Sequence, residues 1–242
     1  MDGYLFVFLF IFVASTVEGG KILFHGMHNS KSHIGSMLPL AKSLVTSGHD
    51  VHFLETTYAT KPYKFPPGIT NHFVSLPNDG SFEEQFLKGM WTMILEPQQL
   101  AALFVAGDQA FAETYDTHFS VVEPLLNATW DMVVADELFS MGAYALSMYH
   151  YEMKKTPMVV VSTTCVIQPF TWLISLVNIG FHCAQTKPLA EDWRQFVEDP
   201  ASKGTILIAF GTNVVWEYAP ETVLSAFFGT IEELTDYRFV LE

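Results

Sequence analysis

Short apolar runs alternate with polar and amphipathic stretches along this chain. Residues 21–26, 50–55, 130–135 and 158–161 are such runs, each bounded by turn-forming or polar residues. After the first run, apolar residues recur at the three- and four-residue spacing of one helix face; they are Met37, Leu40, Ala41, Leu44 and Val45. Strands that are apolar throughout and separated by helices predict an α/β fold, with a parallel sheet covered on both faces.

The loop after the first predicted strand carries the most informative polar residues. His33 lies in this loop, and Pro39, which fits the first turn of a helix, predicts that the helix begins near Ser36 and ends at Gly48. Because ligands bind at the carboxyl ends of the strands in open parallel sheets, an imidazole there is well placed to act as a general base. A loop histidine that only forms local hydrogen bonds is the alternative.

Asp136 follows the apolar run 130–135 and therefore reaches the same edge of the sheet as His33. A carboxylate in this position can hold an imidazole in one tautomer and stabilise its protonated form. Asp136 is also a suitable N-cap for the helix predicted over residues 138–151. The two roles are compatible.

The segments between these strands are less regular. Residues 61–80 are rich in Pro, Gly and Asn, whereas residues 81–126 are expected to be mainly helical, with a break near Pro97. Residues 158–181 form the longest apolar region of the chain. Polar side chains inside this region favour a buried strand and a loop over a membrane-spanning helix.

These patterns divide the chain into four parts. Residues 1–20 are a predicted secretory signal, because a short apolar run is followed there by small residues. Residues 21–185 form an N-terminal α/β domain, and the polar residues 186–203 form a linker. Residues 204–242 hold a single strand–helix–strand unit. Such a unit cannot cover both faces of its sheet, so it is expected to be only part of a second domain.

The charge and the cysteines narrow the possible partners and compartments. A formal net charge of −14 argues against binding to nucleic acid or to anionic membrane surfaces. Cys165 and Cys183 are the two cysteines of the chain, and both a disulfide bridge and two unpaired buried thiols remain open. Asn127 begins an Asn-Ala-Thr glycosylation acceptor, which agrees with a chain that enters the secretory pathway.

Two further groups of residues are of types that can bind ligands. His25, His28 and His33 lie close in sequence, but no carboxylate is present at a metal-ligand spacing, so ordinary strand and loop histidines are favoured over a metal site. Gly211 and Thr212 follow a predicted strand, where backbone N–H groups and a hydroxyl can receive phosphate oxygens; a plain turn is the alternative. No G-x-G-x-x-G, Walker or G-x-S-x-G sequence occurs, which disfavours dinucleotide oxidoreductases, P-loop enzymes and α/β-hydrolases.

Five segments, in the same order along the chain, resemble the animal UDP-glycosyltransferases, the glucuronosyl- and glucosyltransferase family. The segments are Ser32-His33-Ile34-Gly35-Ser36-Met37 with Pro39-Leu40-Ala41, then Ser47-Gly48-His49-Asp50-Val51, residues 131–136, Phe196-Val197-Glu198-Asp199 and residues 204–212. The resemblance runs from about Lys21 to Glu242.

The resemblance implies a GT-B architecture, with one Rossmann-like domain for the acceptor and a second for the UDP-sugar. His33 matches the family's base, which deprotonates the acceptor hydroxyl, and Asp136 matches the carboxylate that orients it. Gly211 and Thr212 match the turn that approaches the nucleotide. The implied partners are a UDP-sugar that carries a hexose or glucuronic acid and a small lipophilic acceptor with a hydroxyl group. The implied reaction needs no metal or other cofactor, and the implied compartment is the lumen of the endoplasmic reticulum.

The chain also departs from the family. The family's long donor-binding signature and its membrane anchor would follow Glu242, and the span between Cys165 and Gly180 is shorter than the family's. The chain therefore resembles a truncated transferase, expected to be weak or inactive because most contacts to UDP are missing. A non-catalytic acceptor-binding or regulatory partner, including a dimer with full-length relatives, is the alternative from another class; a fragment that does not fold stably is a third.

Overall fold

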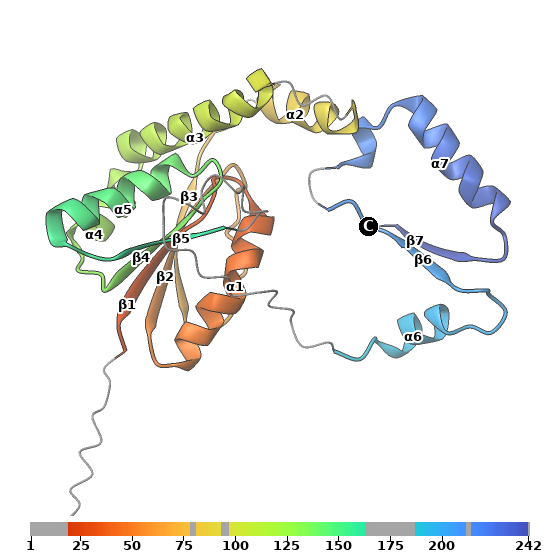
Figure 1. Ribbon diagram of the computed structural model, residues 1–242, viewed down its shortest axis with the longest axis horizontal. Helices are drawn as coiled ribbons and strands as arrows, with labels where there is room; N and C mark the ends of the chain where they lie inside the picture. Colours follow the sequence, from red (N-terminus) through yellow and green to blue (C-terminus); the bar gives the residue numbers. More distant parts are fainter. Residues whose placement is uncertain (1–18, 78–80, 93–96, 163–186, 212–213, 242) are drawn as a thin grey trace, which may run out of the picture.

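The structure is a computed structural model that describes residues 19–77, 81–92, 97–162, 187–211 and 214–241 (Figure 1). The predicted signal lies almost entirely outside these residues. So do Cys165, Cys183 and the apolar segment that follows residue 162.

A five-stranded sheet organises residues 19–162. Its strands are β1 (Lys21–His25), β2 (Asp50–Thr57), β3 (Ile69–Ser75), β4 (Met132–Asp136) and β5 (Met158–Val161). All neighbouring strands are parallel, and their order is β3-β2-β1-β4-β5. This is the order of a doubly wound, Rossmann-like sheet. The α/β fold class predicted from the sequence is confirmed.

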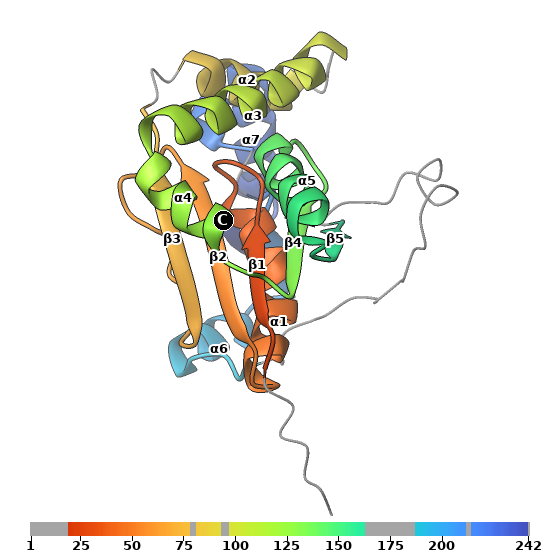
Figure 2. The same ribbon diagram turned by 90° about the vertical axis from the view of Figure 1, so that its left-hand side faces the viewer.

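Helices cover both faces of the sheet, as the continuous apolar strands require. Side chains alternate along β1, so that Phe24 packs with Phe53 beneath α1 (Lys31–Thr46), while Leu23 packs on the opposite face. That opposite face is covered by α3 (Pro97–Thr117), α4 (Phe119–Asn127) and α5 (Met141–Lys154). Figure 2 views the sheet from this side. The two apolar layers bury a core that fixes the positions of the strand ends.

Helix α1 begins earlier than the sequence predicted. Its N-cap is Ser30 rather than a residue near Ser36, so His33 lies in the first turn of the helix and Pro39 lies inside it. Proline at position 39 removes one backbone hydrogen bond, and its ring crowds the carbonyl of Gly35 one turn earlier. The turn before it is held by the Ser30 cap and by Ile34 and Met37, which are buried against the sheet. Packing and capping therefore outweigh the positional preference of proline.

The described residues of the predicted helical region 81–126 form three helices. In addition to α3 and α4, it contains α2 (Ser81–Thr92), which extends away from the sheet (Figure 1). Within the described parts of the chain, no helix is both long enough and apolar enough to cross a membrane. Asn127 and Thr129 of the glycosylation acceptor are exposed at the end of α4, and glycosylation itself stays a prediction.

A second, smaller unit comprises residues 187–241. Strands β6 (Thr205–Ile208) and β7 (Arg238–Leu241) pair in parallel, and they are connected through the 3-10 helix η2 (Trp216–Tyr218) and α7 (Glu221–Glu233). This is the strand–helix–strand unit predicted for residues 204–242. The predicted linker 186–203 contains a short helix, α6 (Glu191–Val197). An ion pair between Asp199 and Arg238 ties the end of this segment to β7.

Candidate functional site

The strand order of the sheet reverses between β1 and β4. From β1 the chain passes through α1 to β2 on one side, and from β4 it passes through α5 to β5 on the other. The loops after the two strands therefore diverge, and this switch point is where ligands bind in open parallel sheets. His33, in the first turn of α1, and Asp136, the last residue of β4, both lie at this point.

Asn29 anchors the loop after β1 to β2. Asn29 has a left-handed φ of 53°. Its backbone N–H donates to the Thr56 carbonyl at 2.9 Å, and its side-chain oxygen accepts hydrogen bonds from the Thr57 hydroxyl and the Tyr58 N–H. Asparagine adopts this backbone region more readily than most residues. The loop that delivers α1 and His33 is thereby fixed on the sheet.

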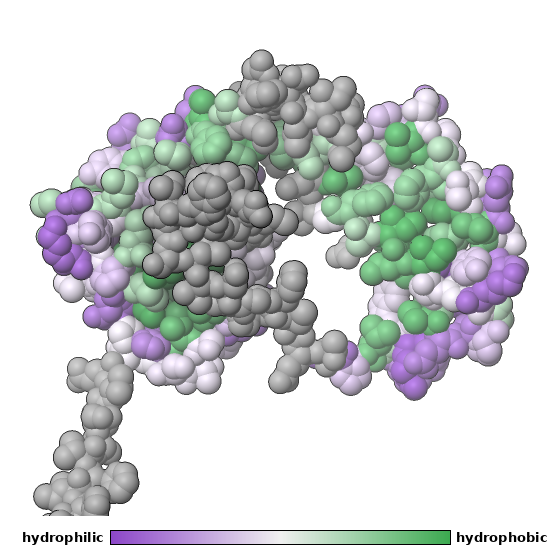
Figure 3. Space-filling view, viewed as in Figure 1, coloured by the Kyte–Doolittle hydropathy of each residue, from purple (hydrophilic) through white to green (hydrophobic). Residues whose placement is uncertain are grey.

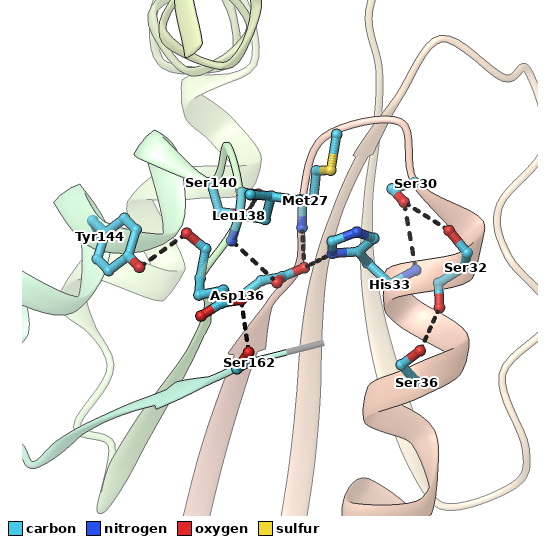
Figure 4. Close-up of polar contacts among 11 residues, drawn as sticks. Met27, Ser30, Ser32, His33, Ser36, Asp136, Leu138, Ser140, Tyr144 and Ser162 are labelled. Carbon is cyan, nitrogen blue, oxygen red and sulfur yellow. Dashed lines mark hydrogen bonds and ion pairs between the residues drawn. The ribbon is translucent and has the colours of Figure 1, made fainter. Parts of the chain in front are cut away.

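His33 and Asp136 are hydrogen-bonded to each other. Nδ1 of His33 lies 2.7 Å from Oδ2 of Asp136 (Figure 4). The Asp136 side chain is fully buried, whereas 14% of the His33 side chain is exposed. The backbone N–H of Met27 donates to the same carboxylate oxygen at 3.0 Å. The carboxylate is therefore held in place from the loop after β1 as well as from its own strand.

This geometry selects one form of the imidazole. A carboxylate accepts hydrogen bonds, so Nδ1 carries the proton and the lone pair of the neutral ring resides on Nε2. If Nε2 takes up a proton, the buried carboxylate stabilises the resulting imidazolium. The pair can thus perform general-base chemistry. The catalytic roles of the two residues stay predictions.

Asp136 is not the N-cap of the following helix. Helix α5 begins at Met141, and Ser140 occupies the position before it. The four-residue connection contains Phe139 at a left-handed φ of 51°, and the N–H of Leu138 lies 3.5 Å from Oδ1 of Asp136. A non-glycine residue in this region of φ is uncommon and is often found at functional sites. The prediction that Asp136 is the N-cap of the following helix is therefore wrong.

Further polar residues lie beside this pair that the sequence interpretation did not identify. Glu137 accepts a hydrogen bond from the Ser162 hydroxyl at 2.6 Å, and its carbonyl accepts one from the Tyr144 hydroxyl at 3.0 Å. Burial raises the pKa of Tyr144, with Glu137 and Asp136 contributing in the same direction. Tyr144 is accordingly a neutral phenol. Its hydroxyl fixes the loop after β4.

His25 and His28 are neutral residues of the same edge. Burial lowers the pKa of each from 6.5 to about 4. Nδ1 of His28 lies 3.0 Å from the Thr56 hydroxyl. Throughout the described residues, no three His, Cys, Asp or Glu side chains are grouped so that they could hold a metal ion.

A cavity of about 170 Å³ adjoins the loops of the site, between the ends of β1 and β2 and the helices α3 and α5. Two helical glycines make room for the close approach of these elements. A Cβ at Gly107 would lie 2.5 Å from the Phe139 carbonyl oxygen, and a Cβ at Gly142 would lie 3.0 Å from Cε1 of His25. The sequence alone does not show which elements these two glycines bring together.

Gly211, one of the two predicted nucleotide-binding residues, follows strand β6 of the second unit. Gly211 has a φ of +75°, and nothing lies within 4 Å of the position a Cβ would occupy. Thr212 is outside the described residues. Contact of Gly211 and Thr212 with a nucleotide stays a prediction.

Comparison with known proteins gives only distant similarity. No protein-family model matches the chain, and no curated protein matches it. Among solved structures, the chain is similar to the calicheamicin glycosyltransferase CalG4 at 13% identity and a TM-score of 0.36, covering 92% of this chain and 47% of that one. It is similar to TcCGT1, solved in complex with UDP, at 12% identity and a TM-score of 0.37, covering 92% of this chain and 50% of that one.

A third similar structure is the kitacinnamycin glycotransferase, at 17% identity and a TM-score of 0.37, with 62% of this chain and 32% of that one covered. The chain therefore spans between about a third and a half of the length of these structures. The fold assignment rests on the strand order and the helix layers described above.

Proposed function

We propose that this chain contains the acceptor-side catalytic site of a UDP-glycosyltransferase. In this proposal a hexose or glucuronic acid passes from a UDP-sugar to a hydroxyl of a small lipophilic acceptor. The single observation that carries the proposal is the hydrogen bond between His33 and a fully buried Asp136 at the switch point of the sheet. The sequence segments that resemble the animal UDP-glycosyltransferases support it independently.

The proposed step is a single displacement. The acceptor hydroxyl gives its proton to Nε2 of His33, and its oxygen forms a bond to the anomeric carbon of the sugar. The bond from that carbon to the diphosphate oxygen breaks, UDP leaves, and the configuration inverts. Asp136 keeps Nδ1 protonated and stabilises the imidazolium. Gly211 and Thr212 are proposed to approach the diphosphate, and no metal ion takes part.

The test is UDP release by the purified chain, offered UDP-glucose or UDP-glucuronic acid with phenolic acceptors. Loss of a general base reduces rates by about 100- to 10,000-fold, so His33→Ala and Asp136→Asn are both expected to abolish measurable release. His118→Ala, at the junction of α3 and α4, is the control and should retain the wild-type rate. Measurable release that is equal in the wild type and His33→Ala would overturn the assignment of His33.

A second candidate is a non-catalytic acceptor-binding protein that pairs with a related full-length transferase. The specific observation in its favour is the apolar surface of residues 187–241, where Leu207, Phe210 and Phe228 are exposed. Figure 3 shows hydrophobic residues gathered on the visible face of this unit. Acceptor binding without UDP release, from folded protein, would favour this candidate over the transferase.

A further inference from the structure

Two histidines join β2 to β3, the strand at one edge of the five-stranded sheet (Figure 2). Nδ1 of His52 lies 2.9 Å from Nε2 of His72, so the two rings are hydrogen-bonded to each other. The rings are nearly parallel, with centres 5.2 Å apart and an angle of 13° between their planes. Among the described strands, β3 pairs only with β2. The bond between the rings therefore reinforces the single ladder that holds β3.

The two rings lie on the face of the sheet that α3, α4 and α5 cover. Side chains two residues apart on a strand point to the same face, and His52 is two residues from Leu54 in the core of that face. The rings of His52 and Trp130 meet edge to face, with their centres 5.0 Å apart. Nζ of Lys21 lies 4.7 Å from the centre of the same indole, and the Lys21 backbone N–H donates to Asp131 at 2.6 Å. The His52 side chain is 12% exposed and is thus largely shielded from water.

One carboxylate contacts the pair. Oδ2 of Asp50 lies 3.0 Å from Nε2 of His52, an ion-pair contact without the angles of a hydrogen bond. On β1, Lys21 is close enough for its charge to act on His72. Helix α4 contributes Glu123, which is exposed, and α1 packs on the opposite face of the sheet. Within the described part of the chain, Asp50 is therefore the carboxylate that lies against either ring.

The bond between the rings depends on how many protons the pair holds. A neutral imidazole has one donor nitrogen and one acceptor nitrogen, whereas an imidazolium has two donors and no acceptor. The neutral pair and the singly charged pair can each form the bond. Two imidazolium rings cannot, and they place two positive charges side by side. Burial lowers the pKa of His72 below 6.5, and the charges of His52 and Lys21 act in the same direction, so protonation of His72 is shifted into the acidic range.

We propose that His52 and His72 form an acid-sensitive clamp, which holds β3 on β2 at neutral pH and releases it when both rings are protonated. The released strand binds the second proton more readily than the clamped strand does. The clamp is therefore complete above about pH 6.5 and weakens as the pH falls below that value.

The clamp is connected to the loop that precedes α1. Leu76, directly after β3, donates its backbone N–H to the Thr57 carbonyl at 2.8 Å, and the Thr57 hydroxyl donates to the side-chain oxygen of Asn29 at 2.8 Å. Loosening of β3 thus removes support from the loop that positions His33. Proton binding at the clamp would regulate the site from the opposite end of β2, whatever reaction the site performs, so the inference does not depend on the proposed function.

Amide hydrogen exchange of the full chain between about pH 7.5 and about pH 5 tests the proposal. After correction for the intrinsic pH dependence of exchange, the β3 amides should exchange faster by up to about tenfold per pH unit below 6.5, because opening binds one additional proton. The amides of β4, which lies between β1 and β5, should respond less. Equal pH responses of the β3 and β4 amides would overturn the proposal.

A pair of variants separates the clamp from general stability. In His72→Gln the side-chain amide can donate to Nδ1 of His52 at every pH, so the β3 amides should stay protected at pH 7 and lose their additional response to acid. His118→Gln, at the N-cap of α4, is the control and should keep the wild-type profile. A wild-type acid response of β3 in His72→Gln would contradict the proposal.

An NMR titration of the wild-type chain tests the clamp without any substitution. The ring protons of His52 and His72 should titrate in two coupled steps, with the second step below pH 6.5 and accompanied by chemical-shift changes of the β3 amides. Two independent titrations near pH 6.5 that leave the β3 amides unchanged would overturn the proposal.

Discussion

The two regions of this molecule both contain parallel strands connected through helices, but they differ in how much of the sheet the helices cover. Residues 19–162 place a five-stranded parallel sheet between helices on both faces, whereas residues 187–241 pair two parallel strands beside α7. Among the described residues, every buried apolar side chain lies between Ile22 and Leu146. None of the residues in α6, η2 or α7 is buried.

This difference determines where a preorganised site can exist. Nδ1 of His33 and Oδ2 of Asp136 lie 2.7 Å apart, and β1, β4 and α1, which position the two residues, are each packed in a buried core. Gly211 follows β6, which pairs with a single strand, β7, among the described residues, so the backbone at Gly211 is supported by far less packing. Catalytic groups must be positioned to within a fraction of an ångström. The acceptor side of the proposed reaction is therefore better defined than the donor side.

The largest expected effect on stability comes from replacing one phenylalanine in each region. Phe53 is fully buried and its ring stacks on Phe24 at 4.7 Å, whereas Phe228 is 44% exposed. Phe53→Ala is expected to lower the free energy of unfolding by about 3–5 kcal/mol because it leaves a cavity in the core. Phe228→Ala is expected to change it by less than about 1 kcal/mol. Urea unfolding followed by circular dichroism measures both values.

A similar loss of unfolding free energy in Phe53→Ala and Phe228→Ala would mean that Phe228 is packed as tightly as Phe53, contrary to its exposure. Amide hydrogen exchange on the wild-type chain then locates that packing, since protected amides in β6 and β7 would identify it.

The sequence predicted the sheet well because its strands are apolar on both faces. The runs at residues 21–26, 50–55, 130–135 and 158–161 each correspond to a strand, and their carboxyl ends bring His33 and Asp136 to one edge. Strand polarity and topology alone were sufficient for this placement. The resemblance added the roles of the two residues, which are still to be measured.

Other features depended on tertiary packing and could not be predicted from the sequence. Pro39 suggested a helix start near Ser36, but burial of Ile34 and Met37 extends the helix back to Lys31. The cavity-lining histidines resembled ordinary strand and loop residues because nothing in the sequence indicates that α3 and α5 close over them. Local preferences give the elements; contacts between distant segments decide their ends and the cavities between them.

The pH dependence of stability offers a second, smaller test of the same contrast. Burial lowers the pKa of His25 from 6.5 to about 4, and nearby His28 acts in the same direction while Asp136 opposes it. The unfolded chain binds this proton more readily than the folded chain. The contribution of His25 to the free energy of unfolding is therefore fully present above about pH 6.5, and it decreases by up to about 3 kcal/mol as the pH drops toward 4. Residues 187–241 contain no histidine, so this loss concerns the first region.

His25→Phe isolates this contribution, because it keeps an aromatic ring and removes the titrating group. Urea midpoints at pH 7 and pH 4.5 should differ less in His25→Phe than in the wild type, while His118→Phe should show the wild-type difference. An unchanged pH dependence in His25→Phe would show that His25 is not the residue that couples protonation to unfolding.

The smallest expected effect concerns the contact between the two regions. Trp91, in α2, donates its indole N–H to the Val215 carbonyl at 2.8 Å, and its ring lies 5.2 Å from that of Trp216. Trp91→Phe keeps an aromatic ring but removes the donor, so the loss should be about 1 kcal/mol. Because residues 187–241 have little core of their own, we expect this loss to appear as faster amide exchange in η2 and α7 and to leave β1 and β4 unchanged. Trp193→Phe, at an exposed position in α6, is the matched control; equal exchange in the two variants would mean that the Trp91 contact does not stabilise the second region.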